Sequence, residues 1–183
     1  MDTERDQDAP LTGEGGLLDV ATQAMMDSPL MEAYNDRHGI EAAPVLTVDD
    51  DHKAHAIAQM LDDRIAGRTV VEIGGGLGLL SMHLGFRARQ VFCIEANPVW
   101  ATSFLSALMA HKPANVSYLF GTASQFRGHV RADVAIFCSH SGISSMREAA
   151  AMFAPQVIDV YGEIMAAAPG RFDGLAQVLR GMS

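Results

Sequence analysis

The residues most able to do chemistry lie in two short stretches, each an apolar run that reaches an acid. Residues 70–78 read Val-Val-Glu-Ile-Gly-Gly-Gly-Leu-Gly, and residues 91–95 read Val-Phe-Cys-Ile-Glu. Glycines let backbone N–H groups and the following helix N-terminus approach a ligand closely, and Glu95 can accept hydrogen bonds from both hydroxyls of a ribose. Strand, glycine loop, helix, strand and terminal acid together predict the nucleotide-binding half of a doubly wound α/β domain.

The spacing of the glycines indicates which nucleotide the loop holds. Gly74, Gly76 and Gly78 form Gly-x-Gly-x-Gly, whereas a dinucleotide fingerprint needs a small residue where Leu79 stands, and no P-loop ending is present. Glu72 would repel a pyrophosphate and would favour a cation. S-adenosylmethionine carries a sulfonium and an ammonium, so the pattern favours this cofactor. A NAD-binding module is the less favoured alternative.

These residues resemble a known family. Residues 72–78 are similar to the first motif of class I S-adenosylmethionine-dependent methyltransferases, and Glu95 stands where that family keeps its ribose-binding acid. The stretch 70–124 most resembles the FkbM-type branch, through Leu80–Leu84, Glu95–Pro98 and Asn115-Val116. The resemblance implies a mostly parallel Rossmann-like sheet of order 3-2-1-4-5. It also implies S-adenosylmethionine as the cofactor, held by Glu72, Gly74, Gly76, Gly78, Glu95, Ala96 and Thr122.

The composition limits the number of domains, the class of partner and the cellular location that can be expected. The chain has 183 residues and 49% hydrophobic residues, which suits one folded domain. A net charge of −9, with only two lysines, argues against nucleic acid as the main partner. The acidic start is unlike a signal peptide, and no apolar run is long enough to span a membrane. Cys93 and Cys138 fall in expected strands and are interpreted as buried reduced thiols, so we expect a cytoplasmic protein.

The chain divides into a polar tail expected to be disordered (1–16), a helical extension (17–66) and the Rossmann-like domain (67–183). In the extension, Thr47–Asp51 is expected to open a helix that buries Ile57, Met60, Leu61 and Ile65. Strands are expected at 69–74, 90–95, 116–120, 133–138 and 156–161. Helices are expected between them at 77–86, 98–111, 122–128 and 143–153, and after them at 172–179.

The end of the chain departs from the resembled family. Class I methyltransferases add a closing antiparallel pair of strands after the fifth helix, for which this sequence has no residues left. The fifth strand would then be an open edge, and open edges pair readily with other chains. We therefore expect a homo- or hetero-oligomer through this edge. A shortened chain is the alternative explanation.

The expected acceptor site follows the fourth strand, at Cys138-Ser139-His140-Ser141. FkbM-type chains carry acids where Ser139 and Ser141 stand. His140 is the candidate general base and Ser139 a second catalytic candidate, although a lone histidine at a strand end is also common as a structural residue. Two hypotheses follow. One is a methyltransferase acting on an oxygen or nitrogen of a small molecule or protein; the other is a non-catalytic cofactor-binding subunit that scaffolds a partner chain.

Three further polar features are interpreted as structural. His52 and His55 beside Asp49–Asp51 have metal-ligand spacing, but an acidic helix start with solvated histidines explains them equally well, and no metal is predicted. Asp133 is expected to cap a turn at the start of the fourth strand. Asp159, expected inside the fifth strand, needs a partner if it is buried.

Overall fold

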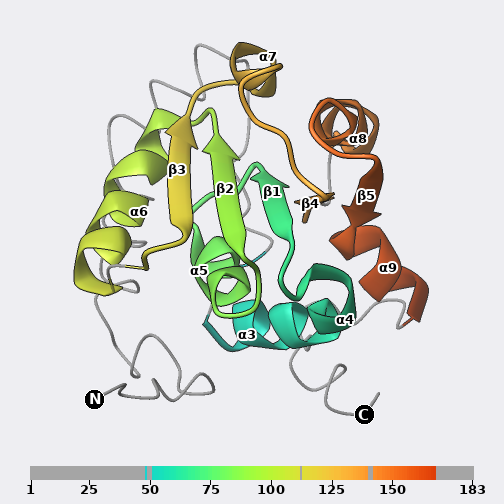
Figure 1. Ribbon diagram of the computed structural model, residues 1–183, viewed down its shortest axis with the longest axis horizontal. Coiled ribbons are helices and arrows are strands. Elements are labelled where there is room, and N and C mark those ends of the chain that lie inside the picture. Colours follow the sequence, from blue (N-terminus) through green and yellow to red (C-terminus); the bar gives the residue numbers. More distant parts are fainter. Residues whose placement is uncertain (1–47, 49–50, 112, 140–141, 168–183) are drawn as a thin grey trace, which may run out of the picture.

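The computed structural model describes residue 48 and residues 51–111, 113–139 and 142–167. Its centre is a parallel sheet of five strands in the order β3-β2-β1-β4-β5 (Figure 1). The strands are β1 (Thr69–Ile73), β2 (Gln90–Glu95), β3 (Val116–Phe120), β4 (Val134–Phe137) and β5 (Gln156–Asp159). This confirms the predicted order and the α/β Rossmann-like fold. The chain order reverses between β1 and β4, the place where such sheets open a crevice.

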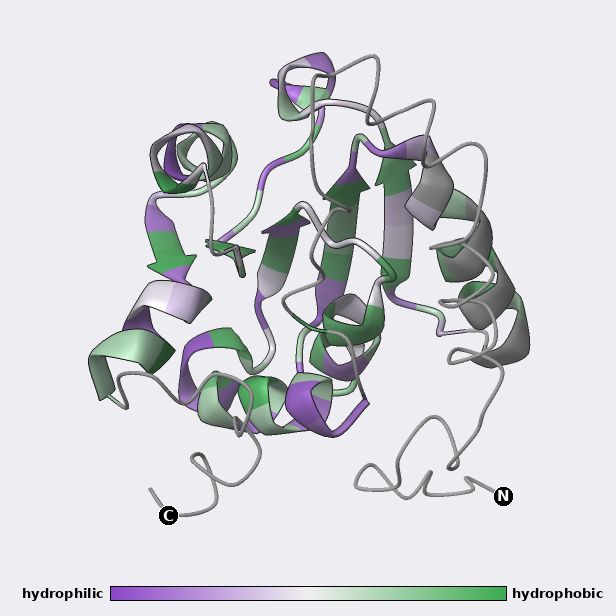
Figure 2. Cartoon of the chain, turned by 180° about the vertical axis from the view of Figure 1, so that it is seen from behind, coloured by the Kyte–Doolittle hydropathy of each residue, from purple (hydrophilic) through white to green (hydrophobic). Residues whose placement is uncertain are grey.

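Helices lie on both faces of the sheet. They are α3 (Asp51–Met60), α4 (Asp62–Ile65), α5 (Leu79–Gly85), α6 (Pro98–His111), α7 (Ala123–Phe126), α8 (Ile143–Ala151) and α9 (Val160–Ala167). Neighbouring strand residues point to opposite faces, and both faces are covered. Val70 packs with the apolar side chains of α3 and α5, whereas Val71 packs with those of α8. Figure 2 shows the resulting hydrophobic interior strands.

The end of β5 corrects one sequence prediction. The strand was expected to run to residue 161, but it ends at Asp159 and α9 begins at Val160. Asp159 Oδ1 accepts a hydrogen bond of 2.8 Å from the Gly162 N–H, which satisfies a backbone donor in the first turn of α9. The apolar run continues through the boundary, so hydrophobicity alone could not locate it. The helix expected at 172–179 lies outside the described residues.

Helix α3 joins the domain core. Ile57 on α3, Leu61 directly after it and Ile65 on α4 are fully buried in the same cluster as β1 and α5, and Met60 is half-buried against it, so the one helix predicted here is two. A polar contact adds to this packing, because Asp51 Oδ1 lies 2.7 Å from His83 Nε2 on α5 and both side chains are buried. The predicted buried face of this helix is therefore confirmed, while Thr47, Asp49 and Asp50 lie outside the described residues.

Two observations concern the periphery. Within the described ranges, β5 pairs with β4 and with no second strand. Across the same ranges, no helix is long and apolar enough to cross a membrane.

Candidate functional site

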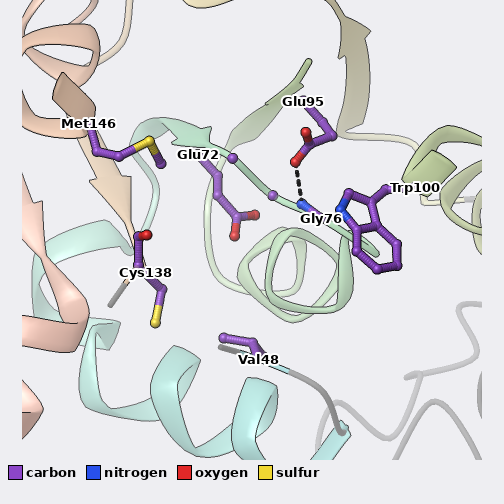
Figure 3. A pocket seen from close by; sticks show the side chains of 10 residues that line it. Val48, Glu72, Gly76, Glu95, Trp100, Cys138 and Met146 are labelled. Carbon is purple, nitrogen blue, oxygen red and sulfur yellow. Dashed lines mark hydrogen bonds between the residues drawn. The ribbon is translucent and has the colours of Figure 1, made fainter. Parts of the chain in front are cut away.

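The carboxyl ends of β1, β2 and β4 meet around a pocket of about 190 Å³, at the point where the strand order reverses (Figure 3). Ligands of open α/β sheets bind in this position. The residues that line it come from the glycine loop, the strand ends and two helices: Val48, Glu72, Gly74, Gly75, Gly76, Glu95, Trp100, Cys138, Ser139 and Met146. The structure thus brings together four of the seven predicted cofactor residues, namely Glu72, Gly74, Gly76 and Glu95.

The glycine loop leaves little room for a side chain at Gly74 and Gly75. Gly74 and Gly76 have φ values of +70° and +55°, which favour glycine. A Cβ on Gly75 would lie 2.2 Å from the Cys93 Sγ atom on β2. The Gly74 N–H also donates to the Ile94 carbonyl at 2.8 Å. The loop is therefore fixed against β2, with its backbone next to the pocket.

Glu95 ends β2 with its carboxylate held by backbone N–H groups. Oε2 accepts from the Gly76 N–H at 2.8 Å (Figure 3). Oε1 accepts from the Asn97 N–H at 2.6 Å. Burial raises the pKa of this carboxyl, whereas the hydrogen bonds from Asn97, Gly76 and Ala96 oppose the change. A carboxylate oxygen can accept more than one hydrogen bond. Each oxygen therefore keeps acceptor capacity for a ligand hydroxyl.

Glu72 is the more deeply buried acid, with 3% of its surface exposed. The Ser81 hydroxyl on α5 donates a hydrogen bond to its Oε2 atom. Burial raises the pKa of Glu72 to about 7, and the nearby Glu95 carboxylate adds to the rise, whereas the Ser81 hydrogen bonds lower it.

The opposite wall is the expected acceptor side. Cys138 and Ser139 follow β4, Met146 reaches in from α8, and Val48 precedes α3 (Figure 3). None of these described side chains is a carboxylate. Burial raises the pKa of the Cys138 thiol, so the thiol stays protonated. Ser139 stands where it was expected, while His140 lies outside the described residues, and its proposed role as a base stays a prediction.

The other three predicted cofactor residues do not line the pocket. Gly78 has φ +76°, and a Cβ there would lie 1.5 Å from the Phe104 ring, so its glycine is required for packing between the loop and α6. Ala96 is exposed beside Glu95. Thr122 is also exposed, and it caps α7 through a reciprocal pair of hydrogen bonds with Gln125.

Four residues near the pocket were missed by sequence reasoning: Val48, Ser81, Trp100 and Met146. Trp100, only 4% exposed, lies near Glu95 and Gly76 (Figure 3). A signal for it was available in the sequence, because it is the chain's single tryptophan and follows Glu95, the predicted ribose-binding acid, by five residues. Met146 gave no such signal, since it lies 72 residues after Gly74, the loop glycine beside which it packs.

The remaining polar candidates have structural partners or lie apart from the pocket. Asp133 Oδ2 accepts a hydrogen bond from the Thr69 N–H at 2.8 Å, so this carboxylate joins the start of β1 to the residue before β4, whereas a local turn cap was predicted. Asp159 pairs with Arg147 at 3.2 Å. Over the described ranges, no group of three or more His, Cys, Asp or Glu side chains is placed to hold a metal ion.

Comparisons with known proteins identify the fold. No family model matches the sequence, and no curated protein matches it. Among solved structures, the CcbJ methyltransferase from Streptomyces caelestis is 17% identical, with a TM-score of 0.50 over 72% of this chain and 54% of that one. The chain has the class I methyltransferase fold. The N-terminal domain of EvdMO1, solved in the presence of SAH and D-fucose, is 14% identical, with a TM-score of 0.50 over 57% of this chain and 48% of its own.

The chain spans about half the length of these solved structures. In the class I methyltransferase fold, the strands that supply Glu72 and Glu95 are neighbours in the sheet, with Glu72 in register with Cys93. The shared fold therefore explains why the two acids predicted from separate motifs reach one pocket.

Proposed function

We propose that this chain binds S-adenosylmethionine in the pocket between the glycine loop and the end of β4. The observation that carries the proposal is the convergence of Glu72, Glu95 and the glycine loop at the point where the strand order reverses. Glu95 would accept the ribose hydroxyls, and Trp100 would supply an apolar surface beside it. Glu72 gives a site for positive charge and would repel the pyrophosphate of a dinucleotide.

The leading proposal is methyl transfer to an oxygen or nitrogen of a small molecule or a protein. The acceptor atom would attack the methyl carbon in line with the sulfonium, the C–S bond would break, and the sulfur would keep the electron pair as S-adenosylhomocysteine. The acceptor's proton would leave to a base, for which His140 is the sequence candidate. Positioning supplies much of the rate in such a reaction.

The second proposal is a non-catalytic cofactor-binding subunit. It is favoured by the described acceptor wall, where Cys138, Ser139 and Met146 supply no carboxylate base. The FkbM-type assignment remains part of the leading proposal. One motif of this resemblance, Asn115-Val116, has a structural role in the fold. Asn115 Nδ2 donates to the Gly85 and Ala88 carbonyls at 2.7 and 3.0 Å and so joins the segment before β3 to the end of α5.

Calorimetry with S-adenosylmethionine and with NAD tests the cofactor. We expect binding of the former, and binding of NAD alone would overturn the proposal. Incubation with a labelled methyl donor and cell extract then separates the two functions, because transfer of label supports the enzyme and binding without transfer supports the silent subunit. His140→Ala is the matched variant, expected to lower transfer with cofactor affinity retained.

The proposal extends to a partner chain on β5. Parallel sheets leave backbone donors and acceptors free along an edge strand, and the described residues pair β5 on one side only. We expect a solution mass above the 19.6 kDa of one chain. A monomeric mass by light scattering would remove this part of the proposal.

A further inference from the structure

Helix α6 lacks the charged face of a surface helix, although it lies at the outer side of the domain beside the edge strand β3 (Figure 1). Its residues, Pro98–His111, include no Asp, Glu, Lys or Arg, and before His111 the only polar ones are Thr102, Ser103 and Ser106. A helix at the surface of a soluble domain normally carries charged or polar residues on the side away from the core. The composition of α6 therefore indicates that something covers its outer side.

The two sides of α6 differ in how they are covered. Phe104 is fully buried and stacks on Tyr118 of β3, with the ring centroids 4.4 Å apart. Leu105 and Met109 lie one turn apart on another side of the helix and are 51% and 75% exposed. Among the described residues, Met109 is the most exposed large apolar side chain. Leu105 and Met109 thus form an apolar surface, the outer face of α6, that no described element covers.

The sequence supplies a segment with matching chemistry outside the described residues. Residues 17–26 read Leu-Leu-Asp-Val-Ala-Thr-Gln-Ala-Met-Met, with apolar residues at 17, 18, 20, 21, 24 and 25. This spacing is typical of a helix with one apolar side, which must be buried against another apolar surface. Asp19, Thr22 and Gln23 fall on the opposite side of such a helix. The apolar side can therefore be buried without burying a charge.

The described chain begins next to α6, which places this segment within reach of it. Val48 lines the same pocket as Trp100, a residue of the first turn of α6 (Figure 3). Residues 27–47 join the segment to that point, and a random coil of about 20 residues spans about 25 Å. Helix α6 is about 21 Å long. A segment tethered in this way meets α6 at an effective concentration in about the millimolar range, which favours it over a second copy of the chain.

We propose that residues 17–26 of the same chain pack on the outer face of α6 and cover Leu105 and Met109. The contact buries the apolar side of the segment on an uncharged surface and leaves Asp19 in water. It makes the N-terminal extension part of the folded domain at the β3 edge, opposite the β5 edge. The contact does not depend on the proposed cofactor.

Photo-crosslinking tests this contact in the full chain. Met109→Cys is labelled with benzophenone maleimide, and Glu148→Cys, at an exposed position of α8 on the other side of the sheet, is the matched control. The unsubstituted chain reports any labelling of Cys93 and Cys138. After irradiation we expect a product with the mass of one chain, in which position 109 is joined to the tryptic peptide 6–37, and none from the control. A product of doubled mass, capture of another segment, or no crosslink to this peptide would overturn the proposal.

A second measurement separates loss of this contact from loss of folding. A polarity-sensitive dye on Met109→Cys should emit at shorter wavelength than the same dye on Glu148→Cys, because the segment excludes water from it. Val20→Asp, on the apolar side of the segment, should move the emission to that of the control while far-UV circular dichroism is unchanged. Thr22→Asp, on the polar side, should leave the emission as it was, and equal responses to the two substitutions would count against the contact. Leu105→Cys carries the dye if Met109→Cys does not fold.

Discussion

Replacing Glu72 by Gln in the ligand-free protein should stabilise the fold at high pH and change it little at low pH. The pKa of this carboxyl rises from its ordinary value of 4.5 to about 7 on folding, chiefly through burial. A folded pKa above the unfolded one means that stability from this group is fully present below pH 4.5 and is lost as the pH rises through 7. Glu72→Gln carries no such charge, so its stability should not fall in that window.

The size of the effect follows from the difference of about 2.5 between the two pKa values, which corresponds to about 3 kcal/mol once the pH exceeds 7. Between pH 5.5 and 8 the variant should gain about 2 kcal/mol relative to wild type. Urea denaturation at four pH values in that range measures it. The Gln amide can change the free energy of unfolding by an amount that is the same at every pH, and such a change does not affect how that free energy varies with pH. Glu148→Gln, at an exposed position of α8, is the control and should follow wild type. Parallel profiles for wild type and Glu72→Gln would refute the reasoning.

Three other predictions concern binding and packing. Glu95→Ala should weaken S-adenosylmethionine binding by about 1–3 kcal/mol in calorimetry; unchanged affinity would remove Glu95 from the ribose role. Gly78→Ala should cost at least about 3 kcal/mol in urea denaturation, because a Cβ 1.5 Å from the Phe104 ring must displace it. Gly67→Ala is its matched control, with a similar φ of +67° and nothing within 4 Å, and should cost only about 1–2 kcal/mol. Ligand binding should change the fluorescence of Trp100, the only tryptophan, and a spectrum unmoved by saturating ligand would place that ring outside the binding site.

The sequence predicted those features that depend on local pattern. Apolar runs located the strands because parallel strands are buried on both faces, and the acids at the ends of β1 and β2 had to meet because parallel neighbours finish at one edge. Contacts between side chains far apart in the sequence could not be predicted. Ser81 looked like one polar residue in an apolar helix, and nothing in its neighbourhood indicated that its hydroxyl would meet Glu72.

Two other features show why the site was only partly predicted. Gly78 was predicted to be a ligand-binding glycine, and the structure adds a second requirement for it, the aromatic ring of Phe104 on α6, a contact that spacing cannot reveal. The boundary between β5 and α9 was missed because Asp159 ends the strand by capping the helix, and the next glycine, Gly162, lies inside the helix and not at the boundary.

The buried contact between Asp51 and His83 sets a practical limit on how short a fragment of this protein can be. A fragment that begins at β1 would leave the His83 imidazole in an apolar interior without its carboxylate, and would uncover the side chains of α5 that α3 now covers. The smallest fragment expected to fold therefore starts no later than residue 51. A shorter one should aggregate on expression even though every strand of the sheet is present.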